Sequence, residues 1–177
     1  EKPTEGRPVP EAATAGFLAY DGRQWRHATL SDAHSNVFHK LFDYCPEPDR
    51  CGLASLGGTA AALKLWRPDG TAELLWQEDF GGTFSRLRDA EVGDLLGDGV
   101  PTLAVGTHDK GVVALVRPGP NRYAVTELDR EPATFVHEIE IGDLDGDGVL
   151  EIYATPSQPN KLDGTPQRGS VVRYVPA

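Results

Sequence analysis

Short apolar runs separated by turns recur along the whole chain. Residues 102–106 and 152–155 are two such runs, and each is followed by a second run that begins at Gly111 or Gly169. The chain holds 20 Gly and 14 Pro, and no long stretch places apolar residues at helical period. Many short strands joined by glycine and proline turns are typical of an all-β fold, which we predict here.

The two clearest runs belong to a segment that occurs twice, 49 residues apart. Residues 92–100 and 141–149 share the pattern of an aliphatic residue, Gly, Asp, Leu, any residue, Gly, Asp, Gly and Val. Upstream, residues 60–70 match residues 112–120 at a similar offset, and the Asp-Gly pair at 21–22 predicts a hairpin. Repeats of roughly 40–50 residues with about four short strands each are typical of β-propeller blades.

This spacing divides the chain into a leader and four units. We predict a flexible leader at 1–13, a partial blade at 14–31, four-stranded blades at about 36–79 and 84–130, and an incomplete last blade at 134–177. The chain would then be a β-propeller segment of about three to three and a half four-stranded blades. Because a propeller removes exposed sheet edges by closing its ring, we expect a larger propeller. Another propeller segment, a protein subunit or a second copy would complete it.

The second copy of the repeated segment contains a candidate metal loop. Acidic residues stand at positions 1, 3, 5 and 9 of residues 143–151, as Asp143, Asp145, Asp147 and Glu151. The glycines at 146 and 148 let the backbone bend, and the carbonyl of Val149 would add one oxygen. Ca²⁺ takes six to eight oxygen ligands, whereas an EF-hand needs Glu at position 12, where this chain has Ala154. We predict a calcium loop that is not an EF-hand; the alternative is an acidic turn.

The repeated loop resembles the FG-GAP/VCBS repeats found in the propellers of integrin α-subunits, fungal lectins and many secreted bacterial proteins. Residues 84–175 carry the resemblance, mainly through residues 142–152, whereas residues 13–80 match only by strand pattern. The resemblance implies a propeller of about seven blades. It also implies that Ca²⁺ binds in the loop between the first two strands of a blade, on Asp143, Asp145, Asp147 and Glu151.

The upstream copy of the loop departs from this pattern. Leu96 and Thr102 stand at positions 3 and 9, so only Asp94 and Asp98 remain as carboxylates. Two carboxylates hold calcium poorly, because the ion needs more oxygen ligands than they supply. We therefore expect this loop to be free of metal and to keep only the shape of the turn.

Cys45 and Cys51 are the only cysteines, and two prolines lie between them. They fall where an early blade would carry its loop between the first and second strands. Two free thiols and metal ligation are the alternatives, but two thiolates without further Cys make a poor tetrahedral site. We favour a disulfide, which implies an oxidising compartment and a secreted, periplasmic or cell-surface protein.

Charge and hydropathy narrow the range of partners. The formal net charge is −10 and the pI is about 4.9, which speaks against nucleic acid because phosphate binding needs a basic surface. No apolar run is long enough to cross a membrane. The chain has no Met and starts with Glu, which we interpret as a processed chain from which a signal peptide could have been removed.

A second candidate site lies on the expected inner strands. His39, Arg88 and the pair His137-Glu138 occupy similar places in three successive units. Facing a central channel, they could bind a sugar, a carboxylate or a second metal, or transfer a proton. The alternative is that they only solvate the channel, and His108 is expected to be an ordinary turn residue.

The sequence thus predicts an extracytoplasmic, calcium-binding β-propeller module for binding or assembly, with carbohydrate as a further candidate ligand. One alternative is the propeller part of a secreted lyase or dehydratase acting on sugars. In that protein the catalytic residues would be His39, Arg88, His137 and Glu138. The other alternative is a purely structural subunit of a larger complex, because a fold alone does not decide function.

Overall fold

The computed structural model describes residues 2–4, 7–9, 11–81, 85–120, 122–159 and 163–176. Their regular structure consists of β-strands, which confirms the predicted all-β fold. The strands are β1 (Lys2–Thr4), β2 (Arg7–Val9), β3 (Ala13–Tyr20), β4 (Trp25–Asp32), β5 (Phe38–Tyr44), β6 (Gly52–Gly57), β7 (Ala61–Trp66), β8 (Ala72–Glu78), β9 (Leu87–Gly93), β10 (Thr102–Thr107), β11 (Val112–Pro118), β12 (Tyr123–Arg130), β13 (Phe135–Gly142), β14 (Glu151–Ser157) and β15 (Val172–Tyr174). Among these residues no helix is long and apolar enough to span a membrane.

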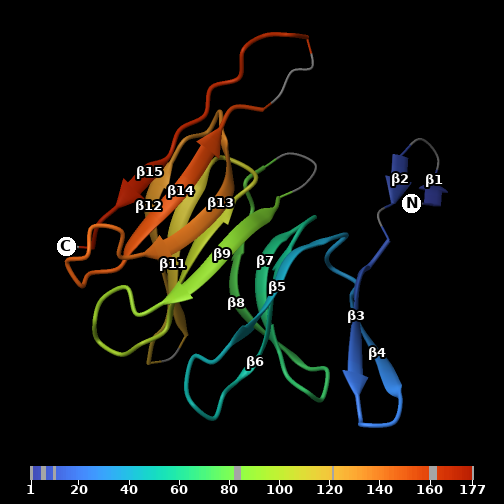
Figure 1. Ribbon diagram of the computed structural model, residues 1–177. Helices are drawn as coiled ribbons and strands as arrows, with labels where there is room; N and C mark the ends of the chain where they lie inside the picture. The colour runs from blue at the N-terminus through green and yellow to red at the C-terminus, as the bar shows by residue number, and fades with distance from the viewer. Residues whose placement is uncertain are drawn as a thin grey trace.

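Each sheet is an antiparallel set of consecutive strands (Figure 1). β1 pairs with β2, and β3 pairs with β4 in a structure that we call the hairpin. Counting the hairpin as the first sheet, we call β5-β6-β7-β8 the second sheet, β9-β10-β11-β12 the third sheet and β13-β14-β15 the last sheet. The described residues do not form a closed barrel or propeller, so the number of blades stays a prediction.

The predicted units can be placed on these sheets. The hairpin covers residues 13–32, and the second, third and last sheets start at Phe38, Leu87 and Phe135. The predicted leader includes β1 and β2, and its residues 1, 5, 6 and 10 lie outside the described residues. Residues 82 and 83, just before the predicted third unit, residues 84 and 121 within it, and residues 160–162 and 177 in the last unit also lie outside the described residues.

The third sheet lies between two hydrophobic cores, which explains its nearly continuous apolar strands. Leu103 and Val105 of β10 point into the core shared with the second sheet, while Ala104 points into the core shared with the last sheet. Alternate residues of a strand face opposite sides, so a strand covered on both faces needs no polar positions. Gly106 allows the third and last sheets to approach closely, because an added Cβ there would lie 2.6 Å from Cγ1 of Val136.

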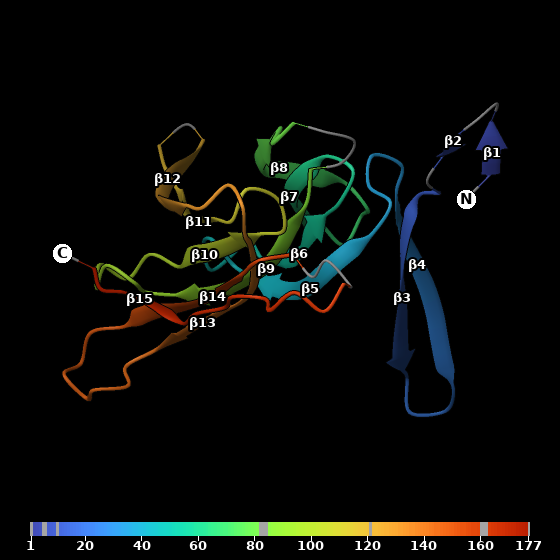
Figure 2. The ribbon, with the colours of Figure 1, turned by 90° about the horizontal axis from the view of Figure 1, so that it is seen from above.

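The first strands of the sheets lie next to one another. β9 contacts β5 of the second sheet and β13 of the last sheet, and Figure 2 shows β5, β9 and β13 close together when seen from above. Residues at the same end of two neighbouring first strands can therefore approach one another. This arrangement places the inner-strand candidates near one another and turns the loops between first and second strands toward one edge.

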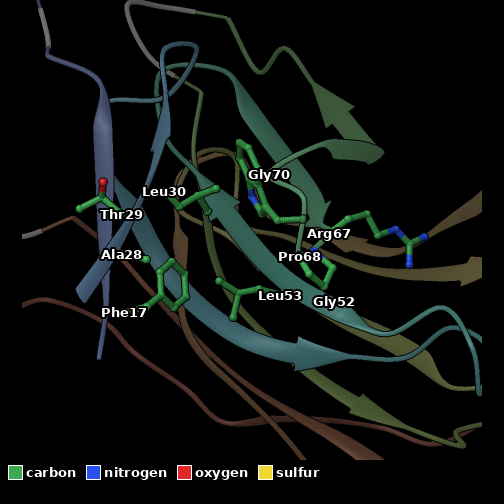
Figure 3. A pocket seen from close by; sticks show the side chains of 10 residues that line it. Phe17, Ala28, Thr29, Leu30, Gly52, Leu53, Arg67, Pro68 and Gly70 are labelled. Atoms are coloured by element: carbon green, nitrogen blue, oxygen red, sulfur yellow. The ribbon is translucent and has the colours of Figure 1, made fainter. Parts of the chain in front are cut away.

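The hairpin stands at the N-terminal side of the second sheet (Figures 1 and 2). A pocket of about 440 Å³ lies between them, and Phe17 and Leu30 of the hairpin line it together with Leu53 and Trp66 (Figure 3). The opposite face of the hairpin is open, since Leu18, Tyr20 and Trp25 are 68%, 58% and 66% exposed.

Candidate metal centre

The loop between β13 and β14 winds around the side chain of Asp143. Oδ1 of Asp143 accepts hydrogen bonds from the amides of Gly146 (2.7 Å) and Asp147 (3.1 Å), and Oδ2 accepts one from Gly148 (2.9 Å). Gly146 and Gly148 have φ angles of 77° and 86°, a left-handed conformation that favours glycine. The loop takes this shape because each of the two glycines turns the backbone so that nearby amides point toward the carboxylate of Asp143.

Three of the predicted ligands come together in this loop. Carboxylate oxygens of Asp143, Asp145 and Glu151 lie within 4.8 Å of one another. The two aspartates are exposed, whereas Glu151 is completely buried at the start of β14. Because all three donors are hard oxygens and two face solvent, the group fits a hard cation whose remaining positions are filled by water or backbone oxygen.

The other two predicted ligands, Asp147 and Val149, lie next to each other at the end of the loop. Oδ1 of Asp147 accepts a hydrogen bond from the amide of Val149 at 2.8 Å, and Asp147 is not part of the group of three. Asp147 and Val149 thus stabilise the last turn before β14. The acidic group that could hold a metal consists of Asp143, Asp145 and Glu151.

Arg173 enters the same group, which the sequence analysis did not anticipate. It lies on β15 opposite Tyr153, and its Nη2 contacts both Oδ2 of Asp145 and Oε1 of Glu151. The other oxygen of Glu151 accepts hydrogen bonds from the Tyr153 hydroxyl (2.9 Å) and the Leu144 amide (3.3 Å). The hydrogen bond from Arg173 holds the pKa of Asp145 below its usual value.

The upstream loop has the same backbone shape with fewer carboxylates. Asp94 accepts hydrogen bonds from the amides of Asp98 and Gly99, both at 3.0 Å, as Asp143 does in the later loop. Thr102 occupies the place of Glu151 and is buried, and Arg117 pairs with Asp98 at 2.7 Å. Within the described ranges, Asp143, Asp145 and Glu151 are the single group of three that could hold a metal.

The corresponding loop of the second sheet is closed by a covalent bond. Cys45 and Cys51 form a disulfide between β5 and β6, which confirms the predicted pairing. Nη1 of Arg67 lies 3.5 Å from the Cys51 carbonyl, and Arg50 and Arg67 both pair with Glu73 at 3.0 Å. The loop is thus tied to the β7–β8 hairpin as well as to itself.

The structure brings two of the inner-strand candidates into contact. Nη1 of Arg88 lies 3.3 Å from Nδ1 of His39, and because Arg can only donate, Nδ1 must accept. Nε2 of His39 then carries the proton, and this buried atom has no hydrogen-bond partner among the described residues. Burial and then the charge of Arg88 lower the pKa of His39 from 6.5 to about 4.

His108 lies in the turn between β10 and β11, as expected, and it also joins this cluster. Its ring stacks on His39 with centroids 6.4 Å apart and on Phe135 at 5.2 Å, and burial lowers its pKa. The ring centroids of Phe135 and His137 lie 4.3 Å apart. Glu138 is exposed, and its backbone amide donates a hydrogen bond to Oγ1 of Thr155. No sequence signal distinguished His108, because it contacts His39 only through the packing of two sheets.

Comparisons of the chain with protein-family models, with curated proteins and with solved structures find no match. The assignment of a function therefore depends on the residues and geometry described above.

Proposed function

We propose that the chain is a calcium-binding β-propeller segment of the FG-GAP/VCBS type, in which residues 143–151 bind one Ca²⁺. The observation that carries this proposal is the convergence of Asp143, Asp145 and Glu151 at the point where the repeated loop pattern is most complete. The group has only oxygen donors, which favours Ca²⁺ over metals that prefer nitrogen or sulfur. A flexible, partly exposed loop also suits Ca²⁺ better than Mg²⁺, which demands near-ideal octahedral geometry.

The proposed role of the ion is to hold the loop between β13 and β14 in place. Asp143 and Asp145 lie in this loop, and Glu151 is the first residue of β14. An ion that bridges Asp143, Asp145 and Glu151 would fix the loop relative to the buried start of β14. The disulfide performs the same task in the second sheet and supports an extracytoplasmic location, where disulfides persist.

Binding or assembly is the proposed task of the whole module. Leu18, Tyr20 and Trp25 form an exposed apolar face on the two-stranded hairpin, and the rings of Tyr20 and Trp25 lie 5.4 Å apart. The occupant that fits such a face is another β-sheet of the same propeller, packed as the second and third sheets pack on each other. It would come from the same gene product, from a partner subunit or from a second copy.

The enzymatic alternative draws less support from the geometry. A proton-transferring His39 would need a free ring nitrogen, but Nδ1 is held by Arg88 and Nε2 is buried. Glu138 is exposed at the side of the cluster, and within the described part of the chain no hydrogen bond joins its carboxylate to His39 or His137. The cluster therefore supports a packing role more strongly than catalysis on a sugar.

The test of the calcium assignment is thermal unfolding with EDTA and with excess Ca²⁺. Wild-type protein should melt at a higher temperature in calcium than in EDTA. The free energy of unfolding should rise by about 2.7 kcal/mol when free Ca²⁺ is a hundredfold above its Kd. Asp145→Ala should abolish this rise because it removes one of the three converging carboxylates. Asp98→Ala, the matched change in the upstream loop, should leave it intact, and equal effects of the two substitutions would refute the assignment.

A further inference from the structure

Arg173 places a positive charge where a bound cation would have to lie. The same nitrogen, Nη2, contacts one oxygen of Asp145 and one oxygen of Glu151, so it occupies the space between two of the three converging carboxylates. Arg173 reaches this point from β15, 22 residues after Glu151 in the sequence. The contact therefore joins the third strand of the last sheet to the loop between the first two.

The burial of Glu151 explains why its carboxylate needs a neighbouring positive charge both with and without bound metal. Its side chain is completely buried, and a buried carboxylate is costly unless a positive charge or several donors compensate it. The Tyr153 hydroxyl and the Leu144 amide satisfy one oxygen, which leaves Oε1 for Arg173. Because a guanidinium stays charged at every physiological pH, it can neutralise this carboxylate without any metal.

We propose that Arg173 is an internal counter-ion that competes with Ca²⁺ for Asp145 and Glu151, an inference that rests on the proposed function. Binding of the ion displaces the guanidinium from the loop, because one point between two oxygens cannot hold both cations. The site then keeps its shape without metal and binds Ca²⁺ more weakly than its three carboxylates alone would. Calcium also frees Arg173, so it uncouples β15 from the loop.

The upstream loop supplies a matched comparison. Arg117 pairs with Asp98 in a loop of the same backbone shape, but Thr102 replaces the buried glutamate. Arg117 therefore neutralises a single exposed carboxylate and does not stand between two converging ones. Its removal changes the local charge by the same amount as removal of Arg173 but leaves the 143–151 site untouched.

Isothermal titration of the whole chain with CaCl₂ tests the competition on wild-type protein, Arg173→Gln and Arg117→Gln. Arg173→Gln should bind Ca²⁺ about tenfold more tightly or better, since the competing charge is gone, and Arg117→Gln should bind as wild type does. In EDTA, Arg173→Gln should melt below wild type, and calcium should raise its melting temperature more than it raises that of wild type.

The lysine variant separates the effect of the charge at position 173 from the effect of the side chain's packing. Arg173→Lys retains the charge and should bind Ca²⁺ within about threefold of wild type, which separates charge competition from loss of packing if the glutamine variant folds poorly. Unchanged or weaker binding by Arg173→Gln, with clear binding by wild type, would overturn the competition and leave the calcium assignment standing. Absence of binding in both proteins would overturn the calcium assignment itself.

Discussion

The carboxylate of Asp89 accepts a hydrogen bond of 2.8 Å from the backbone amide of Ile139, 50 residues further along the chain. The register of β13 against β14 shifts between Val136 and Ile139, so a bulge frees this amide from its own sheet. Asp89 also pairs with Lys40 of β5 at 2.9 Å. One buried side chain thus links the first strands of the second, third and last sheets.

Removal of the Asp89 carboxylate should therefore weaken the contact between three sheets. We expect Asp89→Ala to lower the free energy of unfolding by about 2–4 kcal/mol, because it leaves the buried amide of Ile139 without its acceptor and removes the more buried of the two partners of Lys40. Urea unfolding followed by circular dichroism measures this loss. Glu91→Gln, which removes only the more exposed partner of Lys40, should cost less than about 1 kcal/mol. A similar small loss for both variants would show that Asp89 does not tie the sheets together.

His39 should make the protein sensitive to mild acid. Its folded pKa of about 4 lies below the usual 6.5, so between these values the unfolded chain takes up a proton that folded His39 does not. The contribution of His39 to the free energy of unfolding is fully present above pH 6.5 and is lost as the pH drops toward 4. The charged groups that face the ring are Arg88, Arg86 and Asp109, with His108 stacked on it.

The expected result is a difference between wild type and His39→Gln that changes with pH. Between pH 7.5 and 4.5, in EDTA, wild type should lose about 1–2 kcal/mol more unfolding free energy than His39→Gln, allowing for partial exposure of the ring. His27→Gln, on the exposed face of β4, should follow wild type at every pH. Parallel curves for wild type and His39→Gln would contradict the assignment of the acid response to this ring.

The Cys45–Cys51 disulfide should contribute to stability in spite of its short loop. Chain entropy predicts about 2 kcal/mol for a loop of this length, at the low end for disulfides. Mass spectrometry of unreduced protein should show no alkylatable thiol, and the double substitution to Ser should lower the melting temperature in the absence of any reductant. Two free thiols in protein purified without reductant would exclude both the bond and the extracytoplasmic location.

The open face of the hairpin should drive association. We expect light scattering to show self-association of the isolated chain, because Leu18, Tyr20 and Trp25 leave an apolar face in water next to unpaired strand edges. Replacement of Leu18 and Trp25 by Ser should reduce it without changing the unfolding midpoint. A stable monomer at all concentrations would argue against assembly through this face.

The sequence predicted those features that depend on neighbouring residues. Asp143, Asp145 and Glu151 could be recognised because a short loop brings positions 1, 3 and 9 together whatever the rest of the fold does. The strands could be located because buried apolar runs end at glycine-rich turns. The spacing did not reveal that Asp147 would accept a hydrogen bond from the amide of Val149.

Features that depend on strand register were not predictable. Arg173 meets Asp145 and Glu151 only because β15 pairs with β14 so that Arg173 lies opposite Tyr153, and a long connection separates the two strands. The stacking of His108 on His39 likewise requires the third sheet to pack on the second. The bulge that gives Asp89 its amide leaves no mark in the local sequence either.

The most direct test of calcium binding at residues 143–151 uses terbium, which shares the oxygen preference of Ca²⁺ and emits when a nearby tyrosine is excited. The hydroxyl of Tyr153 lies 2.9 Å from Glu151, so an ion in this loop would sit beside a suitable donor. We predict tyrosine-sensitised emission that saturates at one Tb³⁺ per chain, is displaced by Ca²⁺, falls sharply in Tyr153→Phe and disappears in Asp145→Ala. Absence of emission from wild type, or emission that persists unchanged in Asp145→Ala, would contradict the account.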